Sequence, residues 1–212
     1  MKPMLNFPET SRFSRDWSAY YQAIAGRPPR ETLLKALALF DEEMSPQMPR
    51  LAVDLGCGDG RDTVELVRRG WQVLAIDGNE AAIAKLRDRN DFNPLLLESM
   101  VMQFESLALP KSVDLINSSF ALPFCPPQDF PNLWKEITAS LRYGGRFCGQ
   151  LFGDRDSWAT VYPNMTHFSR AQVESLLQPF DVEHFEEEEH PGQTPLGEPR
   201  HWHIFHIVAC KK

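Results

Sequence analysis

Leu51-Ala-Val-Asp-Leu-Gly-Cys-Gly-Asp-Gly-Arg-Asp-Thr63 joins a short apolar run to a glycine-rich turn. The run 51–55 is bounded by turn-forming residues, which predicts a strand buried in a sheet. Gly56, Gly58 and Gly60 then allow the backbone to adopt positive φ angles and leave room for a ligand to approach the main chain. The stretch therefore predicts a strand that ends in a ligand-binding turn.

A short helix is expected directly after this turn. Asp62 is a plausible N-cap, residues 63–69 have a helical pattern, and Gly70 stands where a left-handed C-terminal cap is typical. Strand, glycine turn and helix together predict a cradle for a ligand.

The charges around the turn indicate which ligand the cradle suits. Asp54 precedes the first glycine and Asp59 lies inside the turn, so a pyrophosphate at this place would be repelled. S-adenosylmethionine, with one carboxylate and two positive centres, would be attracted. The spacing Gly-x-Gly-x-Gly also differs from the Gly-x-Gly-x-x-Gly of dinucleotide-binding proteins.

Residues 53–60, Val-Asp-Leu-Gly-Cys-Gly-Asp-Gly, resemble the first motif of the class I S-adenosylmethionine-dependent methyltransferases. The resemblance covers about residues 50–150. It implies an α/β fold with a doubly wound, Rossmann-like sheet of seven strands, mostly parallel with the last strand antiparallel, and helices on both faces. Segments 122–124, 130–134 and 149–153 look like the branch of this class that includes tellurite-resistance-type methyltransferases.

Length and composition favour a single compact domain that acts on a small molecule. The chain has 212 residues and a net charge of −7 without a basic run, so nucleic acid is not expected as a partner. The N-terminus lacks the apolar core of a signal peptide and no stretch is long enough to span a membrane, which predicts a cytoplasmic protein. Four scattered cysteines without metal-ligand spacing suit reduced thiols. The oligomeric state is left open.

The N-terminal part of the chain is expected to have a different role from the main domain. Residues 1–45 are predicted as a helical cap or lid, and residues 46–212 as the cofactor-binding domain, one compact unit. Within the cap, residues 11–26 predict a helix whose Tyr20 and Tyr21 either pack on the domain or close over the site. Arg27-Pro-Pro-Arg30 is interpreted as a break before a second, amphipathic helix over 31–43 that covers one face of the sheet.

Asp77 is the second acid expected at the cofactor site. The strand predicted over 71–76 is joined to the first strand through a helix, so the two should be parallel with Asp77 beside the glycine turn. A carboxylate there can accept both hydroxyls of a ribose, and the resemblance implies the same role. It also implies that Glu105, in place of the commoner Asp, accepts from the adenine amino group, with the backbone N–H of Ser106 directed at the ring. The full expected set is Asp54, Gly56, Cys57, Gly58, Asp77, Gly78, Phe104, Glu105, Ser106 and Asn117.

The methyl acceptor is expected beside the strand predicted over 113–118. The following residues, 119–124, lack the Asn-Pro-Pro-Tyr or Asp-Pro-Pro-Tyr signature of base methylation. Phe120 and Phe124 are candidates for an apolar acceptor pocket, although aromatic residues here can equally be core. Arg155 and Trp158 are further candidates, with a solvated loop as the alternative.

No catalytic residue is assigned. In-line methyl transfer needs mainly alignment, and a general base is required only for an alcohol or a protonated amine. Tyr20, Tyr21 and His203 are weak candidates for such a base. His201 and His203 would share a strand face, but no third ligand indicates a metal. Residues 186–189, four glutamates, are interpreted as a solvated charge run.

Three functions remain open at this point. The first is S-adenosylmethionine-dependent methyl transfer to a small-molecule acceptor. The second is a non-catalytic S-adenosylmethionine-binding domain with a regulatory or partner role, and the third a nicotinamide-dependent oxidoreductase, which the acids of the turn disfavour. The remaining predicted elements are helices over 79–89, 130–141 and 169–178, a glycine corner at 142–145, and strands over 100–104, 146–151, 181–187 and 202–210.

Overall fold

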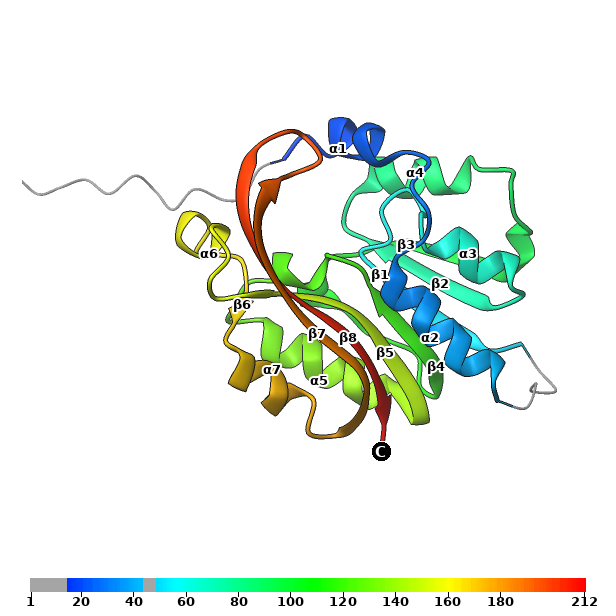
Figure 1. Cartoon of the computed structure of the whole chain (residues 1–212). Coiled ribbons are helices and arrows are strands. Elements are labelled where there is room, and N and C mark those ends of the chain that lie inside the picture. Colours follow the sequence, from blue (N-terminus) through cyan, green and yellow to red (C-terminus); the bar gives the residue numbers. More distant parts are fainter. Residues whose placement is uncertain (1–14, 44–48) are drawn as a thin grey trace, which may run out of the picture.

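A computed structural model describes residues 15–43 and 49–212. Its strands are β1 (Leu51–Leu55), β2 (Gln72–Asp77), β3 (Leu97–Val101), β4 (Val113–Ser118), β5 (Leu141–Gly153), β6 (His167–Phe168), β7 (Phe180–Gln193) and β8 (Pro199–Lys211). They form one sheet in the order β3-β2-β1-β4-β5-β8-β7, with the two-residue β6 paired to β5 (Figure 1). Only β8 is antiparallel to its neighbours, β5 and β7. The predicted seven-stranded, mostly parallel sheet is confirmed, with β6 as an addition.

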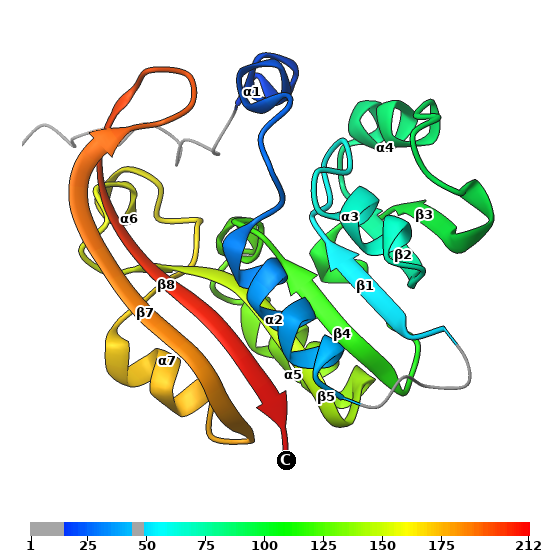
Figure 2. The same cartoon turned by 45° about the vertical axis from the view of Figure 1, so that its right-hand side comes forward.

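Helices cover both faces of this sheet, as predicted (Figures 1 and 2). They are α1 (Trp17–Ile24), α2 (Glu31–Asp41), α3 (Thr63–Arg68), α4 (Glu80–Arg87), α5 (Phe130–Ser140), α6 (Trp158–Val161) and α7 (Arg170–Leu176), with short 3-10 turns η1 (Pro94–Leu96), η2 (Phe104–Ser106) and η3 (Leu122–Phe124). The helices α2, α3 and α4 pack on one face, and α5 and α7 on the other. None of the described helices is both long and apolar enough to cross a bilayer.

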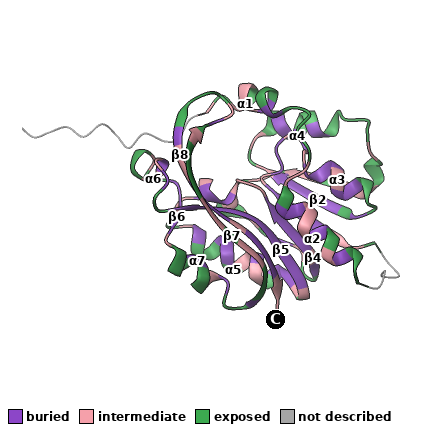
Figure 3. Ribbon diagram, in the orientation of Figure 1, coloured by how far each residue is buried: buried purple, intermediate pink, exposed green. Residues whose placement is uncertain are grey.

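The helix α2 is part of the central core, as its amphipathic pattern predicts. Leu33, Leu37 and Phe40 are fully buried against the sheet (Figure 3). By contrast, α1 lies beyond the carboxyl ends of β1 and β4 (Figure 2). Residues 1–45 were predicted as a cap. Of the two helices described in this segment, α1 lies over the edge of the sheet, whereas α2 packs in the core. The boundary at residue 45, which lies outside the described residues, stays a prediction.

The third strand lies earlier in the chain than predicted. We expected residues 100–104, but β3 ends at Val101, which pairs with Asp77 of β2. The N–H of Met102 then donates to the carbonyl of Asp77, and the chain turns into η2. The start of the strand was misplaced because β3 lies at the sheet edge with its residues exposed or half-buried, so its apolar residues do not mark where it begins.

Two further predictions at the end of the sheet need correction. The glycine corner predicted at 142–145 lies inside β5 as an irregularity of its pairing with β4, and Gly144 adopts a φ of +71° there. The hairpin of β7 and β8 is also longer than predicted and extends beyond the sheet towards α1 (Figure 1).

The glutamate run on β7 is only partly the solvated charge run that was predicted: Glu186 and Glu189 are exposed, but three of the four glutamates have specific partners. Glu187 accepts from Arg155 and contacts His203, while Glu188 contacts His206 and Glu189 contacts His201. The pairing of β7 with β8 places each histidine diagonally across from its glutamate, two residues away from the position directly opposite. The prediction failed because cross-strand partners are not visible in a local charge pattern.

Candidate active site

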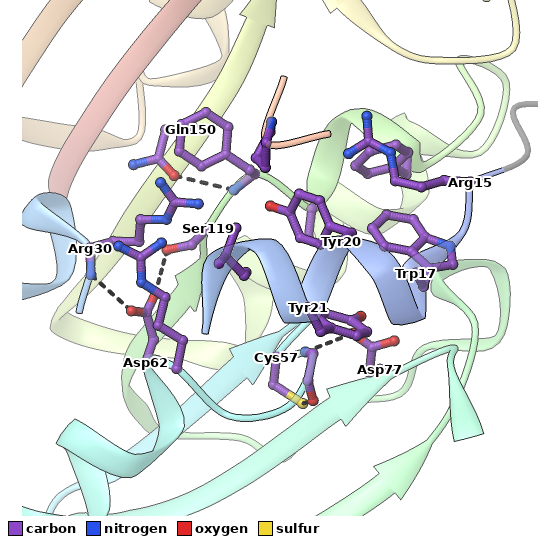
Figure 4. Close-up of a pocket in the computed structure, with 18 of the residues that line it drawn as sticks. Arg15, Trp17, Tyr20, Tyr21, Arg30, Cys57, Asp62, Asp77, Ser119 and Gln150 are labelled. Carbon is purple, nitrogen blue, oxygen red and sulfur yellow. Dashed lines mark hydrogen bonds between the residues drawn. The ribbon is translucent and has the colours of Figure 1, made fainter. Parts of the chain in front are cut away.

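A cavity of about 1190 Å³ opens at the carboxyl ends of the parallel strands, between α1, the glycine turn and the β7–β8 hairpin (Figure 4). Ligand pockets commonly measure roughly 300 to 1,000 Å³, so this one has room for a cofactor and an acceptor together. Among the residues predicted for the site, those that line it are Tyr20, Tyr21, Asp54, Gly56, Cys57, Gly58, Asp77, Gly78, Phe104, Glu105, Phe120 and Phe124.

The N–H groups of the glycine turn are used inside the protein. Those of Gly56 and Cys57 donate to the carbonyl of Ile76 at 2.7 and 3.1 Å. The N–H of Gly58 donates to Oδ2 of Asp77 at 2.8 Å. A pyrophosphate needs such N–H groups directed outwards. The hydrogen bonding of the turn therefore disfavours a dinucleotide, in addition to the charges of its acids.

Gly56 and Gly58 line the cavity, but in the direction of an added Cβ atom the space beside each is filled by protein. A Cβ atom on Gly56 would lie 2.1 Å from that of Ala121, and one on Gly58 would lie 2.7 Å from Cε1 of Tyr21. Their φ angles are +69° and +56°. These glycines are thus required by the turn conformation and by neighbouring side chains, and not by an open space directly above each Cα atom.

Asp77 occupies the predicted position beside the turn. Its Oδ1 accepts from the N–H of Asn79 and its Oδ2 from the N–H of Gly58, each at 2.8 Å. Burial raises the pKa of this carboxyl, and the two backbone hydrogen bonds oppose that shift. Each carboxylate oxygen can accept a second hydrogen bond. The donors of a ribose fit those two remaining positions, so the residues present suit the cofactor that the sequence predicted.

Asp54 belongs to a buried network beneath the cavity. Its two oxygens accept from Nδ2 of Asn117 at 2.8 Å and from Oγ1 of Thr63 at 2.6 Å. Burial, and then the charge of Asp62, raise the pKa of Asp54. Asp62 stands at the predicted N-cap position but makes no side-chain cap; it accepts from Ser119 Oγ at 2.6 Å and from Asn117 instead.

Two residues of the predicted cofactor set do not line the cavity. Asn117 is fully buried, with its amide donating to Asp54 and Asp62. Ser106 lies in η2, where its N–H donates to the carbonyl of Gln103. The N–H that we expected to face an adenine ring is therefore already used within the turn.

The predicted acceptor residues divide into two groups. Phe120 and Phe124 line the cavity, and Phe120 has a φ of +58° while its N–H donates to Oε1 of Gln150. Such a left-handed conformation is strained for a bulky residue and is common at functional sites. Arg155 and Trp158 lie outside the lining: Arg155 pairs with glutamates of β7, and Trp158 is buried.

The three candidate bases differ in whether they line the cavity and in how they are held. The ring of Tyr21 packs on the turn, and burial, followed by the charge of Asp77, raises its pKa, so its phenol stays protonated at neutral pH. His203 is completely buried outside the cavity lining, with ring nitrogens near Glu187 and the N–H of Arg155. Tyr20 lines the cavity.

Several lining residues were missed by sequence reasoning. Arg30 and Arg61 were interpreted only as parts of a helix break and of the turn, and Gln150 only as part of a strand. His206 and Glu188, whose side chains meet at 2.6 Å, line the cavity from the hairpin. A signal did exist for Arg30, since a cation directly after two prolines is not expected in the core, but nothing local indicated what it faces.

Comparison with known proteins agrees with this geometry. Residues 52–145 match the family model described as a methyltransferase domain. This match and the fold agree with the resemblance to class I S-adenosylmethionine-dependent methyltransferases that the sequence motif indicates. S-adenosylmethionine is the cofactor of this class, and two of the similar solved structures hold S-adenosylhomocysteine.

The similarity to individual proteins is low or covers only part of their length. The chain is 30% identical over 176 residues to malonyl-[acyl-carrier protein] O-methyltransferase of Xylella fastidiosa, covering 79% of this chain and 55% of that protein. It is 31% identical over 118 residues to trans-aconitate 2-methyltransferase of Deinococcus radiodurans, covering 54% and 43%. The crystal structure of TehB from Haemophilus influenzae superimposes with a TM-score of 0.71 at 18% identity, covering 91% of this chain and 66% of that one. The chain therefore spans about half the length of these curated relatives.

Proposed function

We propose that this protein transfers the methyl group of S-adenosylmethionine to a small-molecule acceptor. The observation that carries this proposal is the contact between Asp77 and the N–H of Gly58 at the edge of a cavity large enough for two ligands. The malonyl and trans-aconitate names of the two relatives support an acceptor of this kind.

The cofactor, when bound, supplies an electrophilic methyl group on a good leaving group. The residues of this chain that would hold it are Asp77, through ribose hydroxyls, and Phe104 with Glu105, at the adenine. Phe120 and Phe124 would hold the acceptor from the end of β4. Holding two reactants in line can lower a barrier by about 7 to 11 kcal/mol, so alignment is the main contribution expected of the protein.

Titration calorimetry and a methylation assay test this function. We expect S-adenosylmethionine and S-adenosylhomocysteine to bind with one site per chain, and NAD to give no heat. A panel of small acceptors with methyl-labelled S-adenosylmethionine should then yield labelled product. Binding of S-adenosylhomocysteine without turnover across the panel would favour a non-catalytic cofactor-binding domain, and protection by NAD alone would favour an oxidoreductase.

A further inference from the structure

Two arginines line the cavity on the side of β4 and β5. Arg30 directly precedes α2, and its guanidinium lies 4.4 Å from the ring centroid of Phe120. Arg61 directly follows the glycine turn; its Nε donates to the carbonyl of Pro28 at 2.6 Å. Its Nη1 is buried and has no hydrogen-bond partner within the part of the chain that the structure describes.

These two guanidiniums influence each other and share one nearby acid. Burial lowers the pKa of both, and for Arg61 the positive charge of Arg30 is the next cause. Asp62 is the closest acid, but its carboxylate already accepts from the backbone N–H of Arg30 and from Ser119. Across residues 15–43 and 49–212, no carboxylate forms an ion pair with either guanidinium.

The buried arginines of the described chain are paired with carboxylates. Arg200, which is 1% exposed in its side chain, binds Asp156 at 2.8 Å, and Arg146 binds Glu183 at 2.7 Å. Arg30 and Arg61 are half-buried instead, and their hydrogen bonds to Tyr20 and to the carbonyl of Pro28 leave their charges unneutralised. A partly desolvated charge without a counter-ion is costly, and a second cation nearby increases that cost. The pair Arg30 and Arg61 is therefore arranged as a site for an anion that is not part of the protein.

We propose that Arg30 and Arg61 bind a carboxylate of the methyl acceptor, whose apolar part packs on Phe120. This inference rests on the proposed function. A planar carboxylate matches the donor geometry of guanidinium groups. Arg27 also lies near both guanidiniums, so the single charge of Asp62 leaves this side of the cavity positive, as an anion requires.

The position of the pair assigns it to the acceptor and not to the cofactor. Arg30 lies with Ser119 and Gln150, while Asp77, where the ribose is expected, lies on the opposite side of the view (Figure 4). Phe120 in turn lies 6.1 Å from the ring of Phe152 on β5. The arginines thus adjoin an aromatic wall at the end of β4.

Binding of small carboxylates to the full chain saturated with S-adenosylhomocysteine tests the proposal. The probes are acetate, hexanoate, benzoate and 3-phenylpropanoate, each compared with its uncharged primary amide by thermal shift and calorimetry. We expect the carboxylates with larger apolar parts to bind and the amides not to bind. Arg30→Met and Arg61→Met should each weaken carboxylate binding at least tenfold, because a charge-assisted hydrogen bond is lost. Lysine at either position should restore part of the affinity.

The control is Arg170→Met, which removes an exposed guanidinium outside the cavity lining and should leave carboxylate binding unchanged. Affinity for S-adenosylhomocysteine should stay within threefold of wild type in all variants. A tenfold loss of that affinity in Arg30→Met or Arg61→Met would assign the pair to the cofactor and overturn the proposal. Equal binding of the amides and the carboxylates would also overturn the proposal, as would a failure of every carboxylate to bind. These measurements require only that wild type binds S-adenosylhomocysteine. The proposal for the arginine pair can therefore be disproved while the methyltransferase function stands.

Discussion

The ring of Tyr21 lies on Gly58, so that a Cβ atom there would be 2.7 Å from Cε1 of the tyrosine. Tyr21 is 8% exposed and packs with Ile24 and with Ala82 of α4. The helix α1 is therefore attached to the glycine turn by an aromatic contact that only a residue without a side chain permits.

Gly58→Ala should destabilise the protein through both backbone strain and this contact. A left-handed conformation costs an alanine about 1 to 2 kcal/mol, and the overlap with Tyr21 adds to it. In a Tyr21→Ala background only the backbone cost should remain. Urea unfolding of the two single variants and the double variant measures the difference. The same cost of Gly58→Ala in both backgrounds would show that the tyrosine is not held against the turn.

Asp77→Asn should weaken binding of S-adenosylhomocysteine. Replacing the carboxylate removes charge-assisted acceptors for a ribose, worth about 1.5 to 3 kcal/mol, or roughly 10- to 150-fold in affinity. Calorimetry measures this change, with Asp181→Asn as a control at an exposed acid. An unchanged dissociation constant for Asp77→Asn would remove the assigned role.

Asp54 should make stability depend on pH. Burial, and then the charge of Asp62, raise the pKa of Asp54 to about 7, above the roughly 3.9 of an unfolded aspartate. The folded state thus holds the proton more tightly, so stability should fall as pH rises from about 4 to about 7 and level off above. Asp54→Asn has no such titration. Urea unfolding between pH 5 and 8 should show a shallower decline for the variant, and parallel profiles would contradict this assignment.

Breaking the ion pair of Arg200 and Asp156 should be strongly destabilising. Both side chains are almost completely buried, and Arg200 lies between the rings of Trp158 and Trp202 at 3.6 and 3.7 Å. Removing one partner of a buried pair typically costs about 3 to 5 kcal/mol. We therefore expect this loss for Asp156→Asn in denaturant unfolding. Glu174→Gln, which breaks the exposed pair with Arg170, should cost at most about 1 kcal/mol; equal losses would contradict the distinction.

Local patterns sufficed where neighbouring residues determine conformation. The strand 51–55 and the positive φ angles of the glycine turn match the structure. Asp77 could also be placed beside Gly58, because the right-handed connection between parallel strands leaves few alternatives.

Predictions failed where a side chain has a choice of distant partners. Arg155 was a reasonable acceptor ligand by its position after β5, but glutamates on β7 bind it. Ser106 failed for a different, local reason: its backbone N–H donates to the carbonyl of Gln103 inside the turn η2, which was not predicted.

The sequence by itself determined the cradle: an apolar strand, three glycines and two acids whose conformations and charges depend on near neighbours. Only the tertiary structure decided what surrounds the cradle, because Arg30, Gln150 and Glu188 come from segments joined by strand pairing and helix packing. Local propensity sets backbone angles over a few residues, whereas the direction and partners of a side chain in a cavity are set by every element packed around it.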